Sequence, residues 1–111
     1  MNEATKDAEK LLGTIGLCKK AGKLIVGVPM ICDALRRGGK DVPVVVLEAG
    51  DTSENTHKRI SDKCAFYGVE QIRLDCDGAT LSRALGKGAP LAAVAITDRG
   101  MYEMVKKHLA T

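Results

Sequence analysis

Hydrophobic and polar positions follow two different rhythms along this chain. Apolar residues spaced three or four apart predict helices, whereas short unbroken apolar runs predict strands that are buried on both faces. The clearest run covers residues 42–47, between Gly39 and Gly50, and a second one covers residues 91–96. A strand that is buried on both faces needs helices on both sides, so these two runs determine the expected architecture.

Helical and strand segments alternate around these two runs. Helices are expected at about residues 5–21, 29–37, 53–67 and 77–85, with a last helix from residue 98, and shorter strands are expected at residues 23–26 and 69–74. Strands and helices that alternate pack most naturally with the helices in two outer layers. The sequence therefore predicts one α/β domain over residues 1–111, a three-layer α/β/α sandwich with a four-stranded mixed sheet.

Several residues are expected to begin these helices or to anchor them in the core. Thr5 is expected to cap the first helix, and Asp51 and Glu54 have the spacing of a capping box before the third. The residues expected to face inward include Met30, Ile31, Ala34 and Leu35 in the second helix, and Met101, Met104 and Val105 in the last. Cys18, Cys32 and Cys64 lie on apolar helical stripes, so we interpret them as small core residues.

Charge is distributed unevenly, although the net charge of the chain is only +3. Residues 19–40 contain 6 Lys or Arg against 1 Asp, whereas residues 41–77 contain 4 against 8 acidic residues. A basic segment fits either a phosphate-binding face or an ordinary solvated surface. Aromatic residues make up only 3% of the chain, so stacking on bases is scarcely available.

Catalytic and metal-binding motifs are weak in this sequence. The four cysteines form no C-x-x-C pair, and His57 and His108 lack a triad-like spacing to Ser, Cys or a carboxylate, so we expect them at the surface. Glu48 and Asp51, after a central strand, fit either a metal site or helix capping, and capping is the simpler interpretation. We therefore expect no enzyme, no catalytic residue, no metal and no cofactor.

The location of the protein is also inferred from absent signals. The first ten residues are polar, and no apolar run approaches the roughly 20 residues of a membrane-spanning helix. We expect a cytoplasmic, monomeric protein without membrane contact.

Two glycine-containing loops are the best candidates for binding a phosphate group. Gly27 begins a helix, where free backbone N–H groups attract anions, and Lys23 precedes it. Arg36 and Arg37 lie on the exposed side of the same helix. The loop Lys87-Gly88-Ala89 has little side-chain bulk, which lets its backbone approach a ligand.

Two long stretches resemble the ribosomal protein L7Ae/L30e family. They are GKLIVGVPMICDALRRGGKDVPVVVLEAGDTSENTHKRISDKCAFYGV and LSRALGKGAPLAAVAITDRG, and the similarity extends over roughly residues 9–100. Within the family, the sequence is most similar to the bacterial YlxQ-type branch. The resemblance implies an α/β/α fold and binding to kink-turns or related internal loops of RNA, in ribosomes or other ribonucleoproteins.

The resemblance also implies an RNA-binding edge. Gly27 matches the glycine that opens the family's G-T-N-E-x-x-K motif, and Lys23 matches a basic position before it. Gly86 closes the fourth helix as in the family, ahead of the loop that packs against a flipped-out nucleotide. The expected RNA-binding residues are Lys23, Gly27, Val28, Arg36, Arg37, Lys87, Gly88 and Ala89.

Three positions depart from the family motif. Pro29 stands where the family has Asn, Met30 where it has Glu, and Asp33 where it has Lys. Met30 accepts no hydrogen bond from a base edge, and Asp33 repels phosphate, so these replacements predict weakened kink-turn recognition. Two functions stay open: binding of a structured RNA, for example ribosomal RNA, or an interaction module on the same fold for a ribosomal or other protein.

Overall fold

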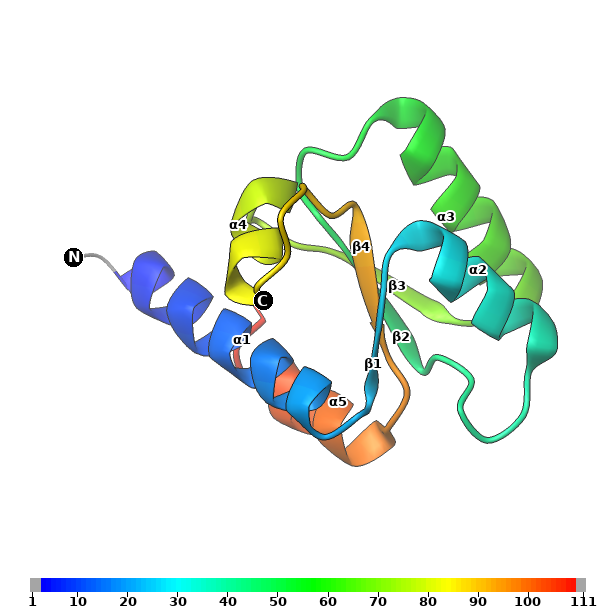
Figure 1. The fold of residues 1–111 in the computed structure, drawn as a ribbon, viewed down its shortest axis with the longest axis horizontal. Helices are drawn as coiled ribbons and strands as arrows, with labels where there is room; N and C mark the ends of the chain where they lie inside the picture. Colours follow the sequence, from blue (N-terminus) through cyan, green and yellow to red (C-terminus); the bar gives the residue numbers. More distant parts are fainter. Residues whose placement is uncertain (1–2, 110–111) are drawn as a thin grey trace.

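The computed structural model describes residues 3–109 and confirms the three-layer α/β/α sandwich. Figure 1 shows a central sheet with helices on both sides. The elements in chain order are α1 (Glu3–Lys20), β1 (Leu24–Val26), α2 (Val28–Arg37), β2 (Val45–Glu48), α3 (Glu54–Tyr67), β3 (Glu70–Arg73), α4 (Gly78–Ala84), β4 (Ala93–Ile96) and α5 (Arg99–Lys106).

The sheet is mixed and has the strand order β1-β4-β2-β3. Strand β4 pairs antiparallel with β1 on one side and with β2 on the other, and β2 pairs parallel with β3. The two wholly apolar runs of the sequence form β2 and β4, and every residue of these two strands is buried. They are the inner strands, as the expected double-sided burial requires.

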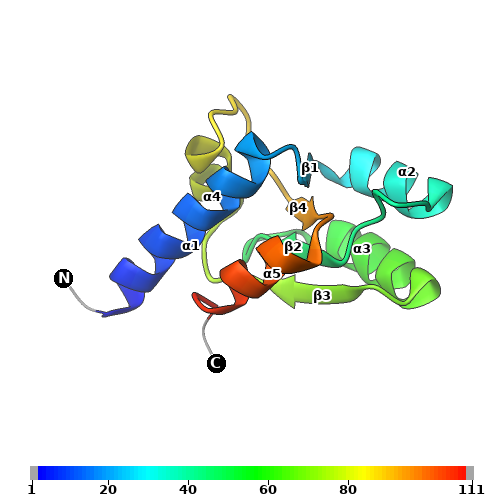
Figure 2. The same cartoon turned by 90° about the horizontal axis from the view of Figure 1, so that it is seen from below.

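Each face of the sheet packs against its own set of helices. The side chains of β2 and β4 alternate, so Val45, Leu47, Val94 and Ile96 face α1, α4 and α5, whereas Val46, Ala93 and Ala95 face α2 and α3. Both views show this division, with α1, α4 and α5 on one side of the sheet and α2 and α3 on the other (Figures 1 and 2).

Side-chain caps begin three of the helices, but not all the expected ones. Ser53 accepts a hydrogen bond from the N–H of Thr56 and begins α3, so the cap expected from Asp51 was wrong. Asp77 begins α4 and Asp98 begins α5 in the same way. The expected Thr5 cap was also wrong, because α1 already begins at Glu3.

Two methionines expected in the core are exposed instead. Met30 is 56% exposed and Met104 is 42% exposed. Since successive helical residues are 100° apart, Met30 lies beside the buried stripe that contains Ile31, and Met104 lies beside the one that contains Val105. Tyr102, which is fully buried, fills the core under α5 instead.

The cysteines behave as small core residues. All four are free thiols; Cys18 and Cys64 are buried, whereas Cys32 and Cys76 are half-buried. Burial raises the pKa of Cys18 and of Cys76, and it raises the pKa of Cys64 to about 11. Among residues 3–109, none of the helices has the length and apolar character needed to cross a membrane.

Candidate functional site

The loop before β4 is fastened at both ends. At one end, Lys19 donates from Nζ to the carbonyl oxygen of Leu85, at 2.6 Å. At the other end, the N–H of Gly27 donates to the carbonyl oxygen of Ala93, at 3.0 Å. The loop therefore passes from the last turn of α1 to the first turn of α2. We call residues 19–28 and 83–92 together the rim.

Hydrogen bonds to α4 hold the shape of this loop. Ser82 donates from Oγ to the carbonyl oxygen of Ala89, at 2.5 Å, and its own carbonyl oxygen accepts from the N–H of Lys87. The N–H of Leu91 donates to the carbonyl oxygen of Gly78. Residues 86–90 are nevertheless exposed, so a loop of small residues is presented to solvent in a fixed conformation.

The first turn of α2 adds backbone donors to the rim. Gly27 precedes it with a φ of 95°, a value that favours glycine, and no side chain caps the helix. Pro29 has no N–H, so Val28 and Met30 contribute the N–H groups that helix geometry leaves unpaired in this turn. The side chain of Val28 packs in the core, and Val28 can therefore act at the rim only through its backbone.

The rim contains basic residues and no acidic ones. Within residues 19–28 and 83–92 there are five cationic side chains and no Asp or Glu; they belong to Lys19, Lys20, Lys23, Arg83 and Lys87. All five residues are exposed, although Lys19 is held by its bond to Leu85. This part of the surface attracts an anionic chain.

Arg36 and Arg37 lie away from the rim. A helix rises about 1.5 Å per residue, so the last residues of α2 are roughly 14 Å from its first turn. Asp33 binds both arginines, through contacts of 2.6 Å to Arg36 and 3.0 Å to Arg37, and these contacts hold the pKa of Asp33 below its ordinary value. The structure therefore divides the expected site residues into a rim group and a separate pair.

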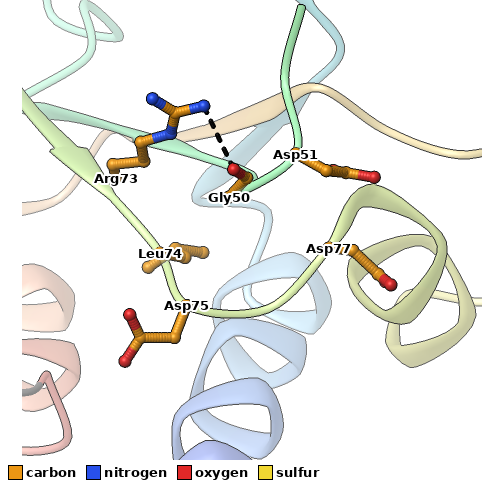
Figure 3. A pocket seen from close by; sticks show the side chains of 6 residues that line it. All are labelled: Gly50, Asp51, Arg73, Leu74, Asp75 and Asp77. Atoms are coloured by element: carbon orange, nitrogen blue, oxygen red, sulfur yellow. Dashed lines mark hydrogen bonds between the residues drawn. The ribbon is translucent and has the colours of Figure 1, made fainter.

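Acidic residues gather at the β3 edge of the sheet, at the same end of the strands as Gly27 and Ala93, because Glu48 at the end of β2 pairs with Ala93. A depression of about 480 Å³ lies where the parallel strands β2 and β3 end, and three carboxylates line it, from Asp51, Asp75 and Asp77 (Figure 3). Asp51 accepts from the N–H of Gly78, and Asp77 caps α4. Two of the three carboxylates therefore stabilise the backbone, and Gly78, which Asp51 binds, also accepts from the N–H of Leu91 in the rim.

Glu48 and His57 form a polar contact that the sequence analysis missed. Glu48 is fully buried beneath α3 and accepts from Nδ1 of His57, at 2.8 Å, and from Nε2 of Gln71, at 2.7 Å. His57 lies at the surface as expected, with 43% of its side chain exposed, but its bond to a buried carboxylate was not predicted. The parity of β2 was the available signal, because Glu48 and Val46 must face the same side of the sheet.

This contact changes the interpretation of the possible metal site. Glu48 is directed under α3, whereas Asp51 binds the backbone at the start of α4, so the two carboxylates do not converge on one point. Within residues 8–109 no group of three or more potential ligands from His, Cys, Asp and Glu is arranged to hold a metal ion.

Two solved structures share this fold. One is described as a protein with unknown function from Bacillus halodurans C; it has a TM-score of 0.76 at 24% identity and covers 89% of this chain and 95% of its own. The other is a Giardia lamblia 15.5kD RNA binding protein, with a TM-score of 0.70 at 17% identity, over 97% of this chain and 87% of its own. At these identities the similarity establishes the fold.

Relatives in sequence identify the family. An RNA-binding protein YlxQ from Enterococcus faecium is 33% identical over 107 residues, which is 96% of each chain. An RNA-binding protein YlxQ from Bacillus subtilis (strain 168) is 34% identical over 86 residues, which is 78% of this chain and 81% of that protein. The expected similarity to the YlxQ-type branch is thus confirmed. Residues 9–106 also match the sequence model of one family. This chain belongs to the ribosomal protein L7Ae/L30e/S12e/Gadd45 family.

Proposed function

We propose that this protein binds structured RNA at the rim, mainly through phosphate contacts and backbone N–H groups. The observation that carries the proposal is the placement of five cations, an uncapped helix start and an exposed loop of small residues that is joined to both α1 and α2. Two relatives are named RNA-binding proteins, which supports the same function. The chain is a binding protein in this proposal and carries out no reaction.

The rim favours RNA shape and charge over the reading of base edges. Met30, which replaces the family's Glu, is an exposed apolar side chain beside the first turn of α2. Asp33, which replaces the family's Lys, is bound to two arginines. We therefore expect a standard kink-turn to bind only modestly better than a plain duplex, and we propose ribosomal RNA as the class to examine first.

Salt dependence tests the phosphate contacts directly. If the five rim cations each neutralise one phosphate, affinity falls by between about two and three orders of magnitude between about 50 and 200 mM salt. Fluorescence anisotropy with a labelled kink-turn RNA measures this slope. Replacing both Lys23 and Lys87 by Glu should weaken binding and flatten the slope by about two contacts.

A charge-matched variant provides the control. Replacing Lys106 and Lys107 by Glu makes the same change in net charge at the C-terminal end of α5, outside the rim, and should alter affinity far less. Equal losses in both variants would mean that only the overall charge matters. An affinity that is independent of salt would contradict phosphate binding altogether.

The exposed side chain of Met30 favours a second candidate function, an interaction module for a protein partner. A bound ribosomal or other protein would bury Met30 against an apolar surface. Affinity purification with and without nuclease distinguishes the two functions, because RNA-mediated partners are lost on digestion and direct protein partners stay. A cytoplasmic location and a monomeric state also stay predictions, which fractionation and light scattering can test.

A further inference from the structure

The outer face of α3 exposes an aromatic ring that the rim does not use. Phe66 is 80% exposed, more than any other large hydrophobic side chain among the described residues. The chain contains only two further aromatic residues: Tyr102 is fully buried, and Tyr67 is half-buried. An exposed Phe of this kind has no part in the core of the fold.

The ring of Phe66 is supported from one side and borders a hollow. Tyr67 contacts it edge-to-face, with ring centroids 4.8 Å apart and an interplanar angle of 77°. A shallow hollow of about 440 Å³ is lined by Arg59, Asp62, Lys63, Phe66 and Tyr67. Arg59, Lys63 and Phe66 are spaced by four and three residues, so they share one face of the helix.

The charges around the ring favour an anionic partner. Asp62 forms an ion pair with Lys58, at 3.8 Å. Neither Arg59 nor Lys63 forms an ion pair with any residue between 8 and 109, and both are exposed. Two free cations therefore flank an exposed ring, the combination that binds the bases and phosphates of single-stranded nucleic acid.

We propose that this face of α3 is a second RNA-binding site, at which an unpaired base stacks on Phe66 while Arg59 and Lys63 contact the neighbouring phosphates. The inference rests on the proposed RNA-binding function and extends it to a single-stranded segment of the same RNA. Stacking on Phe66 is tolerant of sequence, because every base presents a flat π-face.

The position of this site gives the distant arginines of α2 a role. Both views place the ends of α2 and α3 at the same end of the molecule (Figures 1 and 2). Packing of Leu35 with Cys64 and Tyr67 in one core cluster agrees with these views. Arg36 and Arg37 thus lie toward Phe66 and away from Gly27, where they attract RNA that passes from the rim to α3.

A single tryptophan reports on the site directly, because the chain has none of its own. Phe66→Trp should be quenched saturably by a decauridylate, which is single-stranded, and far less by a twelve-base-pair RNA duplex. Met104→Trp places the reporter at another exposed apolar position, on α5, and should not be quenched. Phe66→Ala should weaken decauridylate binding by between about fivefold and a hundredfold, the range of base–aromatic stacking.

The rim variants separate this inference from the proposed function. The second site is wrong if Phe66→Trp is not quenched, or if Phe66→Ala leaves the affinity for decauridylate within twofold of the wild type. The rim still stands in that case if replacing both Lys23 and Lys87 by Glu weakens kink-turn binding. If that double variant binds the kink-turn normally while Phe66→Ala weakens decauridylate binding, the rim is wrong and the α3 site stands. A wild-type protein that binds neither RNA overturns both. Circular dichroism confirms that each variant is folded.

Discussion

Replacement of Glu48 measures how far the attachment of α3 to the sheet depends on one buried carboxylate. Gln71 and His57 both donate to it, at 2.7 and 2.8 Å. Glu48→Leu removes the acceptor but keeps a similar side-chain volume, so little cavity forms. Glu48→Gln keeps one carbonyl acceptor in the same place. The loss of stability in Glu48→Gln therefore isolates the charge and the second hydrogen bond, and the difference between the two variants isolates the hydrogen bond that Gln retains.

The expected loss of stability follows from these contacts. A hydrogen bond to a charged group contributes about 1.5–3 kcal/mol. The bond from His57 counts for less, because its side chain is 43% exposed and can turn toward water. We expect Glu48→Leu to lower the free energy of unfolding by about 3 kcal/mol and Glu48→Gln by about 1 kcal/mol. The free energy of unfolding of a native domain is only about 5–15 kcal/mol in total, so a loss of this size is easily measured.

Thermal and urea unfolding followed by circular dichroism provide the assay. For a chain of 111 residues, 1 kcal/mol corresponds to about 4 °C in Tm, so Glu48→Leu should lower Tm by about 12 °C. Glu103→Leu, at an exposed glutamate of α5, is the control and should change stability by less than about 0.5 kcal/mol. If Glu48→Leu and Glu103→Leu have the same Tm, the polar contact beneath α3 does not stabilise the fold and the reasoning is refuted.

Three further predictions follow from particular residues. In urea unfolding, Gly13→Ala should raise stability by about 0.5–1 kcal/mol, because a Cβ there meets no other atom, whereas Gly78→Ala should lower it by roughly 1–3 kcal/mol, because its Cβ would lie 2.5 Å from the oxygen of Leu91. Asp33→Asn should release Arg36 and Arg37 from their ion pairs with Asp33. In anisotropy titrations, the affinity for RNA should then rise severalfold at low salt and should depend more steeply on salt concentration. An unchanged salt dependence would show that these arginines do not contact RNA. Burial raises the pKa of the Cys64 thiol from 9.0 to about 11, so the unfolded chain loses this proton at a lower pH than the folded chain. The free energy of unfolding should therefore be unaffected by this thiol below pH 9 and should fall as the pH rises toward 11. Cys64→Ala should reduce that fall in urea unfolding at alkaline pH, and an identical fall would refute the assignment.

The layers of the fold were predictable because they depend on short-range pattern. The apolar runs that became β2 and β4 are bounded by turn residues, and only an inner strand accommodates such runs. The phase of each helix was less secure. A shift of one residue turns a side chain by 100°, and that is the error made for Met30 and for Met104.

The candidate site was predictable only in part, because it depends on strand order. The contact between Gly27 and Ala93 exists because β1 and β4 are neighbours, and local sequence does not determine which strands pair. Helix length was known from the sequence, and it already separates Arg37 from Gly27. The contact between Glu48 and His57 crosses from strand to helix through a loop, so it needed the strand parity and the packing of α3 together.

The central place of β4 has a consequence for how this protein is synthesised. Strands β1 and β2 do not pair with each other. Each pairs with β4, residues 93–96, which lies near the end of the chain. The carbonyl groups that accept hydrogen bonds from Lys19 and Gly27 also belong to the last third of the sequence. During translation, the nascent chain therefore leaves β1 unpaired until β4 emerges from the ribosome, and a premature stop before residue 93 gives a product in which β1 has no partner strand.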